Sequence, residues 1–177
     1  MTVEEYLTTP ETVLPQELIF GTLRAAEAPL PRHQRAVGQL YRALDDHVSA
    51  DGLGEVWLSP IDVILDEDRH LVVQPDLLFI SKERDFILTD RIRGAPDLTV
   101  EVLSPNPRIG ELNERLRWFA EYGVRECWVV ELLTRQVSVY GFENGAIARR
   151  AIFERTAPIR SDVLPAFQRT PGLILGF

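Results

Sequence analysis

The sequence predicts an α/β fold in which helices flank a mixed, strongly bent β-sheet. Three observations predict this class. Apolar residues recur at helical spacing in two segments, at positions 31–52 and 108–124. Short runs rich in Val, Ile and Leu lie before, between and after these segments. Turn residues separate several neighbouring runs, so that the predicted order is β-α-β-hairpin-β-α-β-β-β.

The N-terminal part is expected to contain a short helical turn at residues 3–7 and two strands within residues 17–26, joined by a turn at Gly21. A long helix follows, with Pro31 in its first turn and Gly52 at its end. Its apolar residues form one stripe: Val37, Leu40, Tyr41, Leu44 and Val48.

The next segment reads as a β-hairpin. The runs "EVWLSPIDVIL" and "HLVVQPDLLFI" are expected to be its two strands, and "DEDRH" contains the turn between them. The composition of "SKERD", at residues 81–85, predicts a loop after the second strand.

The C-terminal half is expected to begin with the strand "DLTVEVLSP", which Pro105 ends. The second helix then carries an apolar stripe and ends at Gly123; the stripe is Ile109, Leu112, Leu116 and Phe119. The runs "ECWVVEL" and "QVSVYGF" pair across "LTR", and "ENG" turns into a last strand, "AIARRAIFE". The tail "VLPAFQRTPGLIL" is expected to wrap over the surface.

Length and composition predict one globular domain over residues 1–177, with 45% hydrophobic and 26% charged residues. No apolar run has the length of a membrane span, and the acidic N-terminus has no apolar core of a signal peptide. Cys127 is the only cysteine, which excludes an internal disulfide. We therefore expect a cytoplasmic protein and no membrane partner.

The net charge of −8 counts against non-specific nucleic-acid binding through the whole surface, but not against a local basic cleft. Lys82 is the only lysine, and its context predicts an exposed side chain. The other basic residues are arginines and three histidines. An arginine does not accept a proton at working pH, which limits the roles available to it.

Two of the predicted buried strands each contain one carboxylate, Asp76 and Glu101. Burying an unpaired carboxylate is costly, so such groups are usually paired or bound to a metal. Pro75 precedes Asp76 and indicates a strand edge or a bulge, where functional side chains are common. If the strands are neighbours, the two carboxylates could bind Mg²⁺ or Mn²⁺. A half-exposed sheet with two solvated carboxylates is the alternative.

The segments "VQPDLLFI", "GAPDLTVEVLSP" and "LRWFAEYGVRECWVVE" resemble the Uma-type "putative restriction endonucleases", a bacterial branch of the PD-(D/E)XK nuclease superfamily. The N-terminal "PQELIFGTLRAAEAPLPRHQRAVGQLYRAL" and the late "VLPAF" are also similar to that family, so the resemblance covers nearly the whole chain. It implies a restriction endonuclease-like core, with a central mixed sheet between helices.

The resemblance also implies a set of site residues. Asp76 corresponds to the Asp of the "PD" motif and Glu101 to the second acid, both ligands of Mg²⁺ or Mn²⁺, with the backbone carbonyl of Val102 as a third ligand. Glu17, His33 and Glu111 match family positions that could support the site, and Gln74, two residues before Asp76, points to the same face and could support it as well. Ordinary positions remain open: Glu17 on the surface, His33 exposed at the start of a helix or packed on the neighbouring turn, and Gln74 bonded to an edge backbone group.

The sequence departs from the superfamily at its lysine. The usual position, two residues after the second acid, is Leu103, and the family's alternative position on the following helix is Arg115, one turn after Glu111. Arg115 could pair with Asp76 or Glu101, hold a phosphate oxygen or stabilise a transition state, but it cannot serve as a base. The alternative is an ordinary ion pair between Glu111 and Arg115 along the helix.

The resemblance therefore implies a metal-dependent endonuclease that hydrolyses DNA, with Asp76, Glu101 and Arg115 as catalytic residues. The lysine replacement leaves open a catalytically impaired nuclease fold that acts as a binding or assembly module. A third interpretation is an interaction domain whose acids are merely solvated. Several arginines near the carboxylate strands indicate DNA only weakly, because acidic residues are interleaved: Arg84, Arg91, Arg93, Arg108 and Arg117. A homodimer could cover exposed strand edges.

Overall fold

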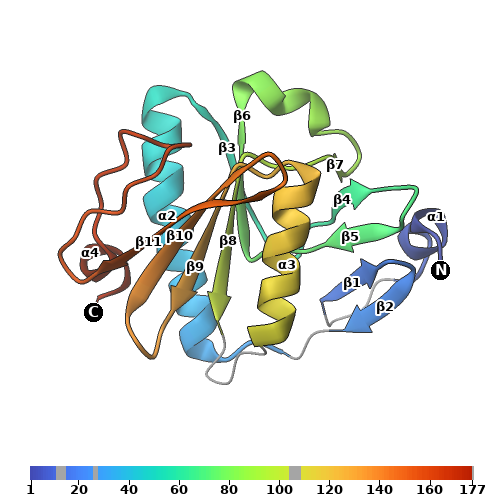
Figure 1. The fold of residues 1–177 in the computed structure, drawn as a ribbon, viewed down its shortest axis with the longest axis horizontal. Helices are drawn as coiled ribbons and strands as arrows, with labels where there is room; N and C mark the ends of the chain where they lie inside the picture. The colour runs from blue at the N-terminus through green and yellow to red at the C-terminus, as the bar shows by residue number, and fades with distance from the viewer. Residues whose placement is uncertain (11–14, 26–27, 104–108, 177) are drawn as a thin grey trace.

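A computed structural model describes residues 1–10, 15–25, 28–103 and 109–176, without the side chains of residues 109 and 110. A six-stranded sheet has the order β11-β10-β9-β8-β6-β3, and a five-stranded sheet has the order β2-β1-β5-β4-β7 (Figure 1). The large sheet contains β3 (Gly54–Leu58), β6 (Leu77–Ser81), β8 (Leu98–Leu103), β9 (Glu126–Glu131), β10 (Gln136–Glu143) and β11 (Ala146–Glu154). The small sheet contains β1 (Gln16–Ile19), β2 (Thr22–Ala25), β4 (Val63–Asp66), β5 (Leu71–Val73) and β7 (Ile92–Arg93).

The helices are α1 (Val3–Leu7), α2 (Pro31–Asp51), α3 (Ile109–Tyr122) and α4 (Pro171–Leu175), with a 3₁₀ helix, η1 (Lys82–Ile87). Both sheets are mixed: β8 pairs with β9 in parallel, and β4 pairs with β7 in parallel, while the other pairs are antiparallel. The predicted class, a mixed α/β fold flanked by helices, is confirmed, but the strands form two sheets.

The large sheet separates two hydrophobic cores. Residues of α2 pack on one face, against Val100 and Val102 of β8 and Trp128 of β9. Residues of α3 and the small sheet pack on the other face, against Cys127 and Val129 of β9. Figure 1 shows α2 and α3 on opposite sides of this sheet. Because side chains alternate along a strand, Glu101 lies on the face that α3 covers.

The predicted long hairpin is present, but each of its strands is divided between the two sheets. Its inner parts, β4 and β5, pair in the small sheet, whereas its outer parts, β3 and β6, pair in the large sheet. Prolines lie at both divisions, Pro60 between β3 and β4 and Pro75 between β5 and β6. A proline lacks the N–H that a continuous ladder requires, which is why the strands break at these positions.

The two predicted long helices form as expected. In α2, Pro31 lies in the first turn and Gly52 ends the helix in the left-handed conformation, at φ 59°. In α3, Leu116 and Phe119 are buried, and Gly123, at φ 96°, follows the last residue. Within "SKERD", Ser81 ends β6 and residues 82–85 belong to η1 rather than to a loop, with Lys82 exposed as predicted. The short strand β7 was not predicted. Pro105 lies outside the described residues.

The expectation that the tail wraps over the surface is wrong. Leu164 and Phe167 are 1% exposed, and α4 places Ile174 in the same core. Phe167 contacts Trp128, with 5.3 Å between the ring centroids. The tail therefore completes the core on the α2 side of the large sheet. No helix in the described part of the chain is long and apolar enough to cross a membrane.

Candidate active site

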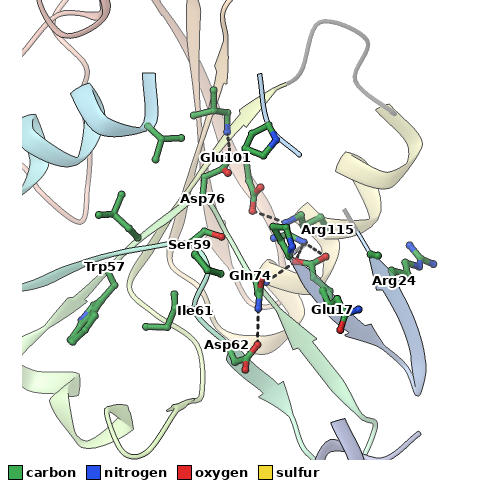
Figure 2. A pocket seen from close by; sticks show the side chains of 18 of the residues that line it. Glu17, Arg24, Trp57, Ser59, Ile61, Asp62, Gln74, Asp76, Glu101 and Arg115 are labelled. Carbon is green, nitrogen blue, oxygen red and sulfur yellow. Dashed lines mark hydrogen bonds and ion pairs between the residues drawn. The ribbon is translucent and has the colours of Figure 1, made fainter. Parts of the chain in front are cut away.

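A large cleft of about 2160 Å³ runs between the two sheets and the N-terminal turns of α2 and α3. Pockets for small ligands typically hold about 300–1,000 Å³, so this cleft has room for a larger molecule. Ten of its lining residues are labelled in Figure 2. Its charged lining is acidic overall, with six carboxylates against four arginines: Glu17, Asp62, Asp76, Asp90, Glu101 and Glu111 against Arg24, Arg32, Arg91 and Arg115.

The register of β6 and β8 brings the two predicted carboxylates together. Leu77 of β6 is opposite Val100 of β8 in the antiparallel ladder. Continuing this register by one residue places Asp76 opposite Glu101, and side chains directly opposite one another project from the same face. The two carboxylates lie close together in Figure 2, and the charge of Asp76 raises the pKa of Glu101.

Asp76 is held at the point where the ladder ends. Its Oδ2 accepts a hydrogen bond from the backbone N–H of Val102 at 2.7 Å, and its carbonyl accepts one from the N–H of Ser59 at 3.0 Å. The Asp76 carboxylate therefore accepts from the backbone N–H of Val102 at the end of the β6–β8 ladder, next to Pro75. Because Asp76 is fixed to both neighbouring strands, its orientation is set by the sheet itself.

Arg115 of α3 lies between two carboxylates. Its Nε donates to Glu101 Oε1 at 2.6 Å, and its Nη1 donates to both oxygens of Glu17, at 2.7 and 3.0 Å (Figure 2). The guanidinium also lies over the ring of Phe119, 5.4 Å from its centroid. All three charged side chains are mostly buried, at 14% exposure for Arg115 and Glu101 and 21% for Glu17. These contacts contradict the surface position considered for Glu17.

Burial raises the pKa of Glu101 to about 8, although the Arg115 guanidinium acts in the opposite direction. Burial also disfavours the charged form of Arg115, but the carboxylates of Glu101 and Glu17 outweigh it and raise the Arg115 pKa. Arg115 is therefore cationic at every working pH. Glu101 instead takes up a proton near neutral pH when no further cation is present.

His33 of α2 lies on the other side of Asp76. Its Nε2 is 3.3 Å from Asp76 Oδ2, and its side chain is 16% exposed, so it does not occupy an open surface position. The contact with Asp76 raises the pKa of His33, more than burial lowers it. The imidazole is thus held against a carboxylate that favours its protonated form.

Gln74 links the site to two residues that the sequence analysis did not single out. Its backbone N–H donates to Glu17 Oε1 at 2.6 Å, and its Nε2 donates to Asp62 Oδ1 at 2.9 Å. Tyr6 of α1 donates its hydroxyl to the same Asp62 oxygen, at 2.9 Å. Asp62 was missed because the segment that contains it was read as the middle of one strand. Only the break at Pro60 exposes it to the cleft.

Asp76 and Glu101 supply oxygen donors of the type that Mg²⁺ and Mn²⁺ prefer. Asp76 Oδ1 and Glu101 Oε2 accept no hydrogen bond from any residue that the structure describes. The acidic excess of the cleft also favours a cation. However, within the described residues no three His, Cys, Asp or Glu side chains converge as a metal-binding group. The residues therefore fit a metal only as a pair of carboxylates with help from a backbone carbonyl such as that of Val102.

The remaining candidate residues that the sequence analysis considered do not contact Asp76 or Glu101 in any described interaction. Glu111 lines the cleft, and Leu103, at the usual lysine position, also lines it. The exposed Lys82 is not among the lining residues. Arg93 pairs with Glu67 and Asp90, and Arg91 lies 3.6 Å from Asp62. The prediction for Arg108 lies outside the described residues.

Comparisons with known proteins address the family and the fold. A family model described as Uma2, "Putative restriction endonuclease", matches residues 3–172. Among solved structures, the fold is similar to a protein of Anabaena variabilis described as a putative nuclease belonging to DUF820. The TM-score is 0.83 at 18% sequence identity, covering 99% of this chain and 98% of that one. No curated protein matches.

Proposed function

The chain belongs to the Uma2 family of putative restriction endonucleases, and from this premise we propose that it hydrolyses phosphodiester bonds in DNA with a divalent metal ion. One observation carries the proposal. Asp76 and Glu101 come from neighbouring strands of the large sheet and meet in a cleft that is larger than a small ligand needs. The similarity in fold to a protein described as a putative nuclease agrees with it.

Asp76, Glu101 and the carbonyl of Val102 are the residues that would hold Mg²⁺ or Mn²⁺. When bound, such an ion would lower the pKa of water and stabilise negative charge on a phosphate oxygen. Asp76 is already oriented by its hydrogen bond from the Val102 N–H. Glu101 must lose its proton to bind the ion, so metal affinity should rise with pH up to about 8.

Two basic side chains flank this pair and would act on the phosphate. The Nε2 of His33 faces Asp76, so a protonated His33 would donate to a phosphate oxygen or a leaving oxygen only by exchanging that contact. Arg115 cannot serve as a base. Its Nε donates to Glu101 and its Nη1 to Glu17, so a phosphate oxygen would be contacted through Nη2, which donates to no residue that the structure describes.

The same contacts support a second candidate function, a nuclease fold without cleavage that acts as a binding or assembly module. Arg115 stands at the position where the family's lysine is expected, and it pairs with Glu101 and Glu17. A guanidinium held between two carboxylates partly neutralises the charge that would attract a metal. In this alternative Arg115 substitutes for the cation and holds the site together.

Calorimetric titration with Mn²⁺ and with Mg²⁺ tests the metal site. We expect wild type to bind, Asp76→Ala to lose binding, and the control Asp68→Ala, which alters an exposed carboxylate, to bind as wild type. Absence of binding to wild type at millimolar metal would exclude the metal-dependent mechanism.

A plasmid-cleavage assay then separates the two functions. Cleavage by wild type that disappears in Asp76→Ala supports the endonuclease. Metal binding without cleavage, followed by cleavage in Arg115→Lys, would show that the arginine suppresses activity. No cleavage in either protein would favour the binding module.

A further inference from the structure

A second, smaller hollow of about 340 Å³ lies beside the cleft, between the β1–β2 turn and the outer face of α3. It shares three lining residues with the cleft, Ile19, Arg24 and Trp118, so the two hollows are adjacent. Figure 1 shows the β1–β2 hairpin at the side of α3, away from the C-terminal segment. A polymer bound at the carboxylate pair could therefore extend into this hollow.

The charge of the hollow is opposite to that of the cleft. Three arginines line it, Arg24, Arg69 and Arg117, against two glutamates, Glu114 and Glu121. Arg24 and Arg117 are exposed, and the side chain of neither makes an ion pair or hydrogen bond with any residue in the described part of the chain. A phosphate backbone that an acidic cleft repels would find two available guanidinium groups here.

Arg69 has a different role from the other two arginines. It pairs with Glu121 at 2.9 Å and donates to the Tyr122 hydroxyl at 2.8 Å. Its guanidinium also lies over the ring of Phe20, 4.9 Å from the centroid. Arg69 therefore fixes the aromatic wall of the hollow, and its charge is already partly neutralised.

The main aromatic residue of this wall is Phe20, whose backbone conformation is unusual for a bulky side chain. Phe20 lies in the β1–β2 turn at φ 48°, a conformation that is costly for a bulky residue, yet its side chain is 40% exposed. It meets Trp118 edge to face, with 5.6 Å between centroids and 85° between the rings. Such rigid, exposed aromatic surface is suited to contact with a sugar or a base.

We infer that this hollow binds the nucleic-acid segment that flanks the bond at the carboxylate pair. Arg24 and Arg117 contact the phosphates, and Phe20 with Trp118 contacts the sugar or base between them. The inference rests on the proposed function, because it takes the same DNA as its ligand. It concerns binding, however, and does not require that the bond be cleaved.

The test is the salt dependence of binding, measured by fluorescence anisotropy with labelled duplex and single-stranded DNA in the presence of Ca²⁺. The variants are Arg24→Gln, Arg117→Gln and the double variant. Arg160→Gln is the matched control, because it removes the same charge from an exposed arginine of the C-terminal segment. Removing one phosphate-binding arginine should reduce the slope of log K against log salt by about 0.9 on duplex and about 0.7 on single strands.

The expected result is one such reduction in slope for each single variant and twice that reduction for the double variant, with Arg160→Gln unchanged. Phe20→Ala should weaken single-strand binding at least about fivefold, whereas Phe86→Ala, at a 72% exposed phenylalanine on η1, should not. A preference for duplex or for single strands in these slopes identifies which form the hollow binds.

Equal slopes in wild type and the double variant, an equal reduction in Arg160→Gln, or no DNA binding by wild type would each overturn the inference. Failure of the proposed function gives a different result. Absent metal binding or cleavage, together with the arginine-dependent slope, would leave the hollow as a DNA-binding surface on a protein without nuclease activity.

Discussion

Replacing Glu101 by glutamine should make the fold more stable at neutral and alkaline pH in the absence of metal. Burial raises the pKa of this carboxyl from 4.5 to about 8. Between these two values the native state holds one proton more than the unfolded chain, so the free energy of unfolding falls as pH rises. The penalty is absent below about pH 4.5 and complete above about pH 8. A glutamine does not ionise and avoids it.

The magnitude follows from the size of the shift. Each pKa unit corresponds to about 1.4 kcal/mol, so the full shift from 4.5 to about 8 corresponds to roughly 5 kcal/mol. Water reaches part of the side chain, which is 14% exposed, and the glutamine keeps only a neutral contact with Arg115. We therefore expect a gain of about 3 kcal/mol for Glu101→Gln relative to wild type at about pH 8 and almost none at about pH 5.

The assay is urea unfolding of both proteins with EDTA, at several pH values from about 5 to about 8. Glu83→Gln, at an exposed glutamate, is the control and should follow wild type throughout. If the curves of stability against pH for Glu101→Gln and wild type run parallel, the carboxyl ionises normally in the fold. The reasoning from burial would then be refuted, and Arg115 would satisfy the carboxylate completely.

Three further outcomes are expected. Phe167→Ala should cost about 3–5 kcal/mol in urea unfolding, because Phe167 is 1% exposed, and Leu173→Ala, at a 71% exposed leucine, should cost little; equal small effects would contradict a buried tail. Glu126→Ala should cost about 3 kcal/mol and make the C-terminal segment sensitive to protease, since it removes a buried acceptor of Trp128, Ser161 and Arg149; unchanged proteolysis would argue against this role. Asp76→Asn should lower the pKa of His33 in an NMR titration, because the Asp76 contact raises it. In wild type, the stability that the His33–Asp76 pair adds is complete below about pH 6.5 and is lost as pH rises through the folded pKa of His33. If His33 titrates identically in Asp76→Asn and in wild type, the two side chains do not interact.

The sequence predicted the local structure where one periodicity dominates. The stripes of α2 and α3 predicted both helices, because 3.6-residue spacing places apolar residues on one face whatever the rest of the chain does. It also identified the two carboxylates, Asp76 and Glu101, as unusual in apolar strands. That anomaly depends only on composition and needs no knowledge of neighbours.

The sequence did not predict the position of a segment where contacts with distant parts of the chain determine that position. The apolar residues of the tail come in short groups that prolines and polar residues separate, and only the open edge of the core beside Trp128 makes Phe167 a core residue. Pro60 and Pro75, where the strands break, are visible in the sequence. The sequence does not show, however, that β4 and β5 then pair in a second sheet, because this depends on which other strands lie beside them.

For the candidate site, the sequence by itself predicted a pair of carboxylates, Asp76 and Glu101, and the family resemblance added Arg115 at a position where a lysine is expected. Only the tertiary structure decided their partners. Arg115 is 98 residues from Glu17 in the chain. It nevertheless joins Glu17 to Glu101, because α3 and the small sheet pack on the same face of the large sheet. Contacts over such separations follow from the packing of whole elements, which no local pattern encodes.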